Sequence, residues 1–366
     1  MKLARIMTVL GCGIGVAGAL VFQGCSSSTT GTGTGTSEVG KPPAKPADAP
    51  TTSTTEKNFA LHTLLLGDTA RGSTVQSPTT AWKKFGYNVD GKVTTRDSTD
   101  ACKLVSGASK TVRDDGETGI DNSFGANILP IILNTAGAEG PAKINQAISD
   151  GSFTIMLNIK GLSDDPKQTA TGLTGALLAG GKFPNGKPTF TSADDWPVRP
   201  ELLSNKTDPN SSTIKFTDSY VVNGTWVNGG QSNVKISLVF SGVALDLTVH
   251  KASLTFDHTG PNKADNGTIA GVINTTELID GLRKVAGRIS TSLCGGSAFE
   301  GIAGQIKQAS DIMDDGTAGA PATECNAISI GLGFTADVIG PPKSVADLGT
   351  PSPDPCAAGS DAGGGG

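Results

Sequence analysis

The chain has 366 residues, a formal net charge of −5 and only 17% charged residues, with 50 glycines and 20 prolines. This length allows one large domain or two of ordinary size. The negative balance excludes a basic field that would attract nucleic acid, and the low charged content argues against a coiled coil. Apolar residues gather in periodic blocks between polar segments, which is typical of a folded domain rather than a disordered chain.

The first 24 residues have the pattern of a bacterial lipoprotein signal peptide. Lys2 and Arg5 precede an uncharged stretch, residues 6–22, and Gly24 stands directly before Cys25. A transmembrane anchor is the alternative, but a span needs about 20 predominantly apolar residues and this stretch is shorter and rich in glycine. We therefore expect cleavage before Cys25, acylation of Cys25 and attachment to a membrane.

Other matches within this leader are weaker. Cys12 fits the local cleavage pattern, but it leaves only about six apolar residues upstream, fewer than a signal peptide needs. Gly13, Gly15 and Gly18 have the spacing of a dinucleotide-binding loop, yet no strand precedes them. Ser26 after the acylated cysteine favours sorting to the outer membrane, so we expect a protein of the bacterial cell envelope.

Composition divides the rest of the chain. Residues 25–57 are rich in Ser, Thr, Gly and Pro and predict a disordered tether. Residues 58–356 carry the periodic blocks and predict a globular domain, with a division into two lobes near residue 200 as an alternative. Residues 357–366 are a glycine-rich tail that we expect to be disordered.

The signal within the globular region is mainly β. Residues 153–160, 234–240, 243–249 and 328–334 alternate apolar and polar side chains with a period of two. Asn223-Gly224 between two short apolar runs predicts a hairpin with a type I′ turn.

Helices are few. Apolar residues at helical spacing predict helices over 275–289, with Asn274 as the N-cap, and over 299–313. A third is expected over 122–134, kinked at Pro130. Strands with few helices predict an antiparallel sandwich or jelly-roll-like domain with helices laid against it.

Four cysteines remain in the exported chain, Cys102, Cys294, Cys325 and Cys356. In an oxidising compartment they predict two disulfides, for which three connectivities exist. We favour Cys294–Cys325 with Cys102–Cys356, because the first pair would clip one helix between two strands. A zinc site is the competing interpretation, and the sequence has no CxxC spacing to support it.

An acidic segment is the candidate ligand site. Five oxygen-bearing side chains fall within nine residues, and glycines between them allow tight turns: Asp114, Asp115, Glu117, Asp121 and Asn122. Hard oxygen ligands on such a loop suit Ca²⁺, although the spacing fails the EF-hand pattern. The alternative is a polar turn whose carboxylates bind backbone N–H groups.

Several segments together resemble a group of surface lipoproteins of myxobacteria and their relatives. They are WKKFGYNVDGK at 82–92, GIDNSFG at 119–125 and CNAISIG at 325–331, with Cys102 and Asp115-Gly116 between them. That group has no assigned activity, so the resemblance implies a class and no mechanism.

Catalytic motifs are not found in the sequence. There is no HExxH or GxSxG, and residues 175–180 approach a phosphate-binding loop but have Gly181 where lysine is required. His250 and His258 are isolated on a strand-like segment, and Trp196 and Trp226 are too few to indicate a sugar platform over core packing. We expect a lipid-anchored, non-catalytic binding or structural component whose partner is a glycan or an envelope protein. A polysaccharide hydrolase with paired carboxylates is the alternative.

Overall fold

The computed structural model describes residues 40–136, 140–184, 186–230, 232–240, 243–294, 296–347 and 355–356. The predicted signal peptide, Cys12, Cys25, most of the tether and the tail lie outside these residues. The described residues from Gly40 onward group by their contacts into one compact unit.

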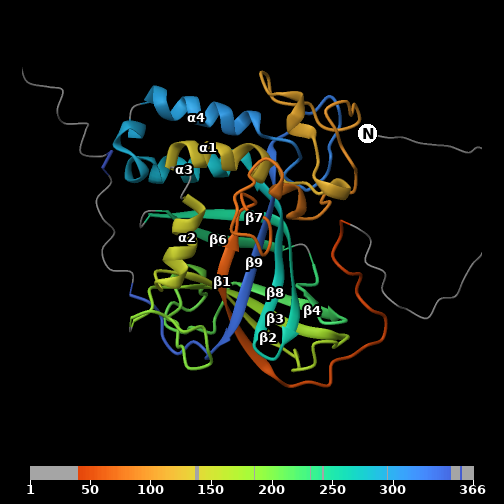
Figure 1. Cartoon of the computed structure of the whole chain (residues 1–366), viewed down its shortest axis with the longest axis vertical. Coiled ribbons are helices and arrows are strands. Elements are labelled where there is room, and N and C mark those ends of the chain that lie inside the picture. The colour runs from red at the N-terminus through yellow and green to blue at the C-terminus, as the bar shows by residue number, and fades with distance from the viewer. Residues whose placement is uncertain are drawn as a thin grey trace, which may run out of the picture. The chain divides into compact units, whose positions relative to one another are not determined.

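Eight antiparallel strands form a closed barrel (Figure 1). Neighbouring strands around it are β5–β4–β3–β2–β1–β9–β8–β7, and pairing of Trp226 with Phe256 joins β5 to β7 and closes the ring. The fold is mainly β, as expected from the sequence. The strands form a barrel, however, rather than the two facing sheets of a sandwich. The strands are β1 (Glu56–Leu65), β2 (Thr154–Lys160), β3 (Ala170–Gly180), β4 (Ile214–Val222), β5 (Thr225–Val227), β7 (Val243–Gly260), β8 (Lys263–Asn274) and β9 (Ala327–Ile339).

The length of β7 explains why a barrel forms. Its first half pairs with β6 (Ser232–Phe240), while its second half pairs with β5 on one side and β8 on the other. Register shifts along β7 mark the irregularities that let one strand serve both arrangements. The sequence pattern ends this strand at residue 249 because polar residues then appear on both faces.

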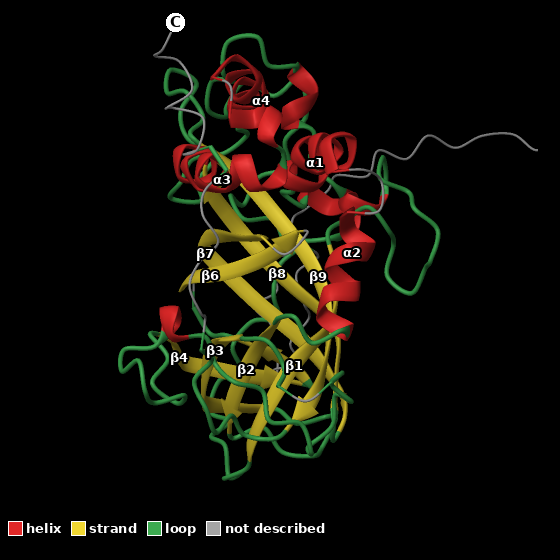
Figure 2. Cartoon of the chain, turned by 90° about the vertical axis from the view of Figure 1, so that its left-hand side faces the viewer, coloured by secondary structure: helices red, strands yellow, loops and turns green. Residues whose placement is uncertain are grey.

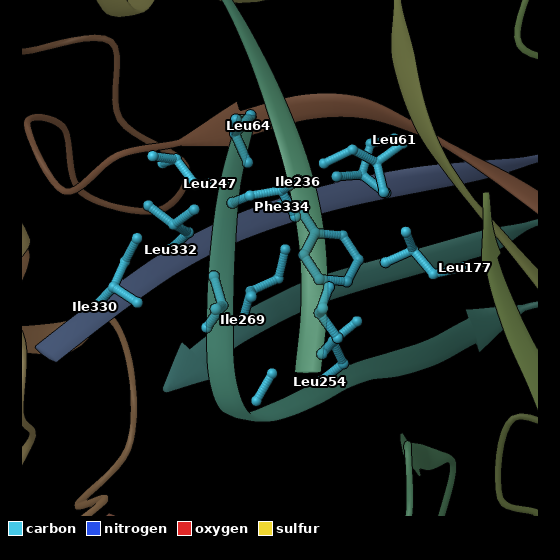
Figure 3. Close-up of a cluster of buried hydrophobic side chains, with 14 of the residues drawn as sticks. Leu61, Leu64, Leu177, Ile236, Leu247, Leu254, Ile269, Ile330, Leu332 and Phe334 are labelled. Carbon is cyan, nitrogen blue, oxygen red and sulfur yellow. The ribbon is translucent and has the colours of Figure 1, made fainter. Parts of the chain in front are cut away.

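The barrel interior is a dry core of aliphatic and aromatic side chains (Figure 3). Leu61 and Leu64 of β1 both point into it, although residues three apart on a regular strand face opposite sides. A register shift between Leu61 and Thr63 against β9 resolves this conflict, since the extra residue of a β-bulge restores the inward direction.

Helices collect at one end and one side of the barrel (Figure 2). α1 (Leu129–Ala136), α3 (Thr275–Ile289) and α4 (Gly296–Gln308) lie over one end, and α2 (Gly140–Ser149) lies along the wall. Within the described residues, none of the helices has the length and apolar content that crossing a membrane requires. The short helices are Ala81–Lys84, Lys110–Arg113, Glu117–Gly119, Pro200–Leu202 and Thr291–Cys294, with one π-helical turn at Phe124–Ile128.

The helices predicted over 275–289 and 299–313 are both present, and the second begins and ends earlier than predicted. The Asn274 side chain accepts from the backbone N–H groups of Thr276 and Glu277, which confirms the N-cap. α4 ends before residue 313 because Ile312 pairs with Ala327 at the start of β9. The helix predicted over 122–134 forms as a π-helical turn, Phe124–Ile128, that continues directly into α1, and Pro130 lies two residues after this turn.

The predicted hairpin is confirmed. β4 and β5 pair around Asn223 and Gly224, whose φ angles of 47° and 85° are both positive, as a type I′ turn requires.

All four cysteines of the domain are disulfide-bonded, but the predicted pairing is wrong. Cys102 is joined to Cys325 and Cys294 to Cys356. The observed pairing follows from the tertiary structure. Lys103 forms a β-bridge with Glu324, so the segment that contains Cys102 lies beside the start of β9. The second disulfide holds the end of the described chain against the short helix that follows α3.

Residues 40–55, which the sequence analysis places in the tether, lie against the barrel. The Thr51 N–H donates to the Thr171 carbonyl at 2.9 Å, and the Tyr220 hydroxyl donates to the Pro43 carbonyl at 2.6 Å. Lys45 also forms an ion pair with Asp218. Backbone hydrogen bonds to strand edges need no apolar side chains, so composition does not reveal this segment. These described residues of the predicted tether therefore contact the strands of the barrel.

Candidate functional site

The first three carboxylates of the acidic segment proposed for calcium each contact a different side chain. Asp114 pairs with the Arg96 guanidinium, Asp115 accepts the Thr94 hydroxyl at 2.8 Å, and Glu117 lies 3.5 Å from the Lys84 ammonium. Each carboxylate thus has a different partner on a different neighbouring turn.

The last two residues of the set are buried and bind backbone groups. Asp121 accepts the N–H of Val89 at 2.6 Å. The Asn122 amide donates to the carbonyls of Trp82, Phe85 and Gly331, and its oxygen accepts the Gly331 N–H at 3.0 Å. Asn122 therefore fastens the long β1–β2 connection to β9.

These contacts give the five side chains partners within the protein, and the calcium hypothesis stays a prediction. Within the described residues, no group of three or more His, Cys, Asp or Glu side chains is placed to hold a metal ion. Burial, reinforced by the nearby charges of Asp90 and Asp115, raises the pKa of Asp121 well above its usual range. Burial likewise raises the pKa of Asp115 to about 6. Asp115 and Asp121 both accept backbone N–H groups, as the alternative of a polar turn predicts.

Other residues singled out from the sequence have structural partners. Trp196 and Trp226 are fully buried, so neither forms a sugar platform. His250 lies 2.9 Å from Glu277, and the Nε2 of buried His258 lies 3.4 Å from the Lys57 ammonium. The glycines at 175–180 belong to β3 and form no phosphate loop.

The acidic doublets lie on loops. Asp164 accepts from Lys57, and Asp195 lies 3.5 Å from the Lys343 ammonium. Asp314 and Asp315 accept hydrogen bonds from Asn274 and Thr317. Three clefts formed by described residues each contain a single carboxylate in their lining, that of Asp114, Asp337 or Asp90.

The cleft around His62 brings together an imidazole, an ammonium group, a carboxylate, an amide and several hydroxyl groups. It measures about 360 Å³, within the usual range for small-ligand sites. We call it the His62 groove, and its lining consists of His62, residues 189–192, Asn262, Lys263, Asp337 and Val338. These residues come from β1, the β3–β4 connection, the β7–β8 turn with the start of β8, and the end of β9.

The bulge in β1 places His62 on the outer wall of the barrel. Ala60, two residues earlier, packs against Trp196 and Ile339 in a small cluster outside the barrel core. His62 is the unpaired residue between Leu61 and Thr63 in the register with β9. Bulges re-aim side chains next to functional sites, and here the bulge points an imidazole into the groove.

Asp337 lies between a lysine and a histidine side chain. Lys263 is directly opposite it on the neighbouring strand β8, and the two form an ion pair. On the other side, the Nδ1 atom of His62 lies 3.0 Å from an Asp337 carboxylate oxygen. Because Asp337 accepts there, the neutral imidazole carries its proton on Nδ1 and leaves Nε2 as an acceptor.

The connection between β3 and β4 forms the opposite wall. Phe190 stacks on the His62 ring, with ring centroids 4.2 Å apart and planes 18° from parallel. The φ angle of Phe190 is 53°, which is costly for a bulky side chain. The buried Asp194 carboxylate maintains this turn by accepting the N–H groups of Thr189 and Phe190 at 2.8 and 2.6 Å. The Gly340 N–H in turn donates to the Asp194 carbonyl, which ties the turn to the end of β9.

Sequence reasoning did not find this groove. His62 and Asp337 are 275 positions apart, and no motif surrounds either residue. The sequence signal that existed is weak: a polar residue where the apolar alternation of residues 59–64 breaks.

Comparisons with known proteins found no relative. No family model matches the chain, and neither a curated protein nor a solved structure matches it.

Proposed function

We propose that the chain is a lipid-anchored protein of the bacterial cell envelope and that it binds its ligand in the His62 groove. The observation that carries the binding role is the arrangement around Asp337. A carboxylate that is 7% exposed holds the Lys263 and His62 side chains, which are 58% and 47% exposed, at one edge of a cleft. Sites built on strands hold such groups in place with little loss of entropy on binding.

The location rests on two further observations. Residues 1–25 have the lipoprotein pattern, and the four domain cysteines form two disulfides, which persist in oxidising compartments. The likeness of residues 82–92, 119–125 and 325–331 to myxobacterial surface lipoproteins points the same way.

The anchor is tested by labelling with radioactive palmitate. We expect the full-length protein to incorporate label and to sediment with membranes, whereas Cys25→Ser loses both properties. Failure of the unchanged protein to incorporate label would refute the anchor.

The binding role is tested by co-sedimentation of the full-length protein with insoluble envelope and plant polysaccharides. Lys263→Ala should weaken any binding observed, because it removes the exposed cation of the groove. The control is Lys110→Ala, which changes an exposed lysine of a short helix outside the groove lining. Equal losses in both variants would remove the groove from the proposal.

The His62–Asp337 pair also favours a second candidate function, the hydrolysis of esters. Asp337 orients His62 so that Nε2 is the free acceptor, and this is the arrangement in which a histidine acts as a general base. Hydrolysis of chromogenic acetate esters that disappears in His62→Gln would support an esterase, and no hydrolysis above the His62→Gln background would reject it.

A further inference from the structure

The groove hides its negative charge and exposes its positive charges. The Asp337 carboxylate is 7% exposed, and the two groups that cover it, Lys263 and His62, are about half exposed. A ligand that enters the groove therefore meets an ammonium group and an imidazole ring before it meets the carboxylate. Exposed cations beside a buried anion favour a ligand with a negative group of its own.

The remaining lining suits a ligand rich in hydroxyl groups. Thr191 and Ser192 bring hydroxyls, and Asn262 brings an amide that can both donate and accept. The His62 ring is held flat against Phe190, so its other side is a rigid surface against which a sugar ring can pack. Hydroxyls, one amide and one flat ring form the usual polar and apolar contacts of a saccharide.

The charge of the groove depends on one group. Asp337 and Lys263 neutralise each other, so the groove is neutral when His62 is neutral and carries one positive charge when it is protonated. Two other carboxylates lie near but outside the lining. Asp194 is engaged by backbone N–H groups, and Asp195 is paired with Lys343. Protonation of His62 therefore adds a cation with no further counter-ion in the lining.

We propose that the His62 groove binds an acidic saccharide, with a uronate carboxylate held between the Lys263 ammonium and the protonated His62 ring. This inference rests on the proposed binding function and adds the ligand class and its pH dependence. Binding is strongest when the His62 imidazole is protonated, since the groove then carries one more positive charge.

The test uses two ligands that differ only in charge, a galacturonate hexamer and its fully methyl-esterified form. Calorimetric titration of the full-length protein is run at pH 5.5 and pH 8. We expect the acid to bind about five- to tenfold more tightly at pH 5.5 than at pH 8, the size of one charge-assisted contact at a partly exposed site. The ester should bind weakly and equally at both pH values.

Two variants separate the contributions. His62→Gln should remove the pH dependence and retain the preference for the acid, whereas Lys263→Gln should reduce that preference at both pH values. Lys110→Ala serves as the control for surface charge, and circular dichroism establishes that each variant is folded.

The outcomes distinguish the two levels of the proposal. If the acid and the ester bind equally at pH 5.5, or if His62→Gln keeps the pH dependence, the acidic-saccharide inference is overturned and saccharide binding stands. If neither hexamer binds at either pH, the acidic-saccharide inference is overturned, and the proposed binding role of the groove is decided by the co-sedimentation experiment.

Discussion

Replacing Asp311 by asparagine removes a carboxyl group that the fold places in a poorly solvated position. Both carboxylate oxygens contact Ser329, which is fully buried in β9: one accepts its N–H at 2.9 Å and the other lies 2.5 Å from its hydroxyl. Burial raises the pKa of Asp311 to about 7, and the charge of Asp115 adds to this, although the Ser329 hydrogen bonds act in the opposite direction.

The sign of the pH dependence follows from this direction. The folded state binds a proton on Asp311 up to about pH 7, whereas the unfolded chain releases it near its ordinary pKa of 3.8. Stability is therefore greatest at low pH for this group and falls as pH rises from about 4 to 7. The full difference corresponds to about 4 kcal/mol, an upper value because solvent reaches part of the residue.

Asp311→Asn should resemble the protonated acid at every pH. At pH 5 the variant should already be more stable than the original protein by about 1.6 kcal/mol, because the unfolded chain has released the Asp311 proton there, and at pH 8 it should be more stable by up to about 4 kcal/mol. The assay is urea unfolding followed by tryptophan fluorescence between pH 5 and pH 8. Asp280→Asn, on the exposed face of α3, is the control. Parallel pH profiles of Asp311→Asn and the original protein would refute the reasoning.

Three further predictions concern stability. Removing the Cys294–Cys356 disulfide, which spans 62 positions, should lower the unfolding free energy by about 4 kcal/mol in urea titrations, and mass mapping without reductant should recover this pair. Burial lowers the pKa of His258, so its contribution to stability should be lost as pH falls below 6.5; His258→Gln should flatten this part of the pH profile, and an unchanged slope would contradict it. Gly224→Ala should lower the thermal midpoint, because its Cβ would lie 2.0 Å from the Pro166 carbonyl oxygen at a positive φ, at a cost of at least about 1–2 kcal/mol; an unchanged midpoint would show that the turn relaxes.

Sequence patterns found the strands with one dry and one polar face. β6 and the first half of β7 alternate as expected, and the hairpin at Asn223-Gly224 forms. β2 was predicted by the same alternation in sequence, although its residues are buried on both faces. β1 was not predicted from the sequence, because Lys57 and Asn58 are buried within it and the bulge at His62 interrupts the pattern of its side chains. β3 was not predicted, because its glycines interrupt the alternation of apolar and polar residues. Gly175 and Gly180 lie against side chains of neighbouring strands.

The His62 groove and the disulfide pairing could not be predicted from the sequence for a different reason. The side chains of the groove come from four segments that only the barrel brings together, and their local sequences have no shared signature. Likewise, the bridge between Lys103 and Glu324 decides which cysteine meets Cys325, and sequence separation carries no information on it.

The position of β1 has a consequence for how the chain acquires its structure. β1 is the first strand to be synthesised, yet it lies between β2 and β9, and Asn58 pairs with Ile339 near the other end of the domain. Ring closure therefore waits for nearly the whole polypeptide, which makes folding slow and dependent on distant contacts. A chain that is still being synthesised lacks its final strand, so its barrel stays open until translation has passed β9.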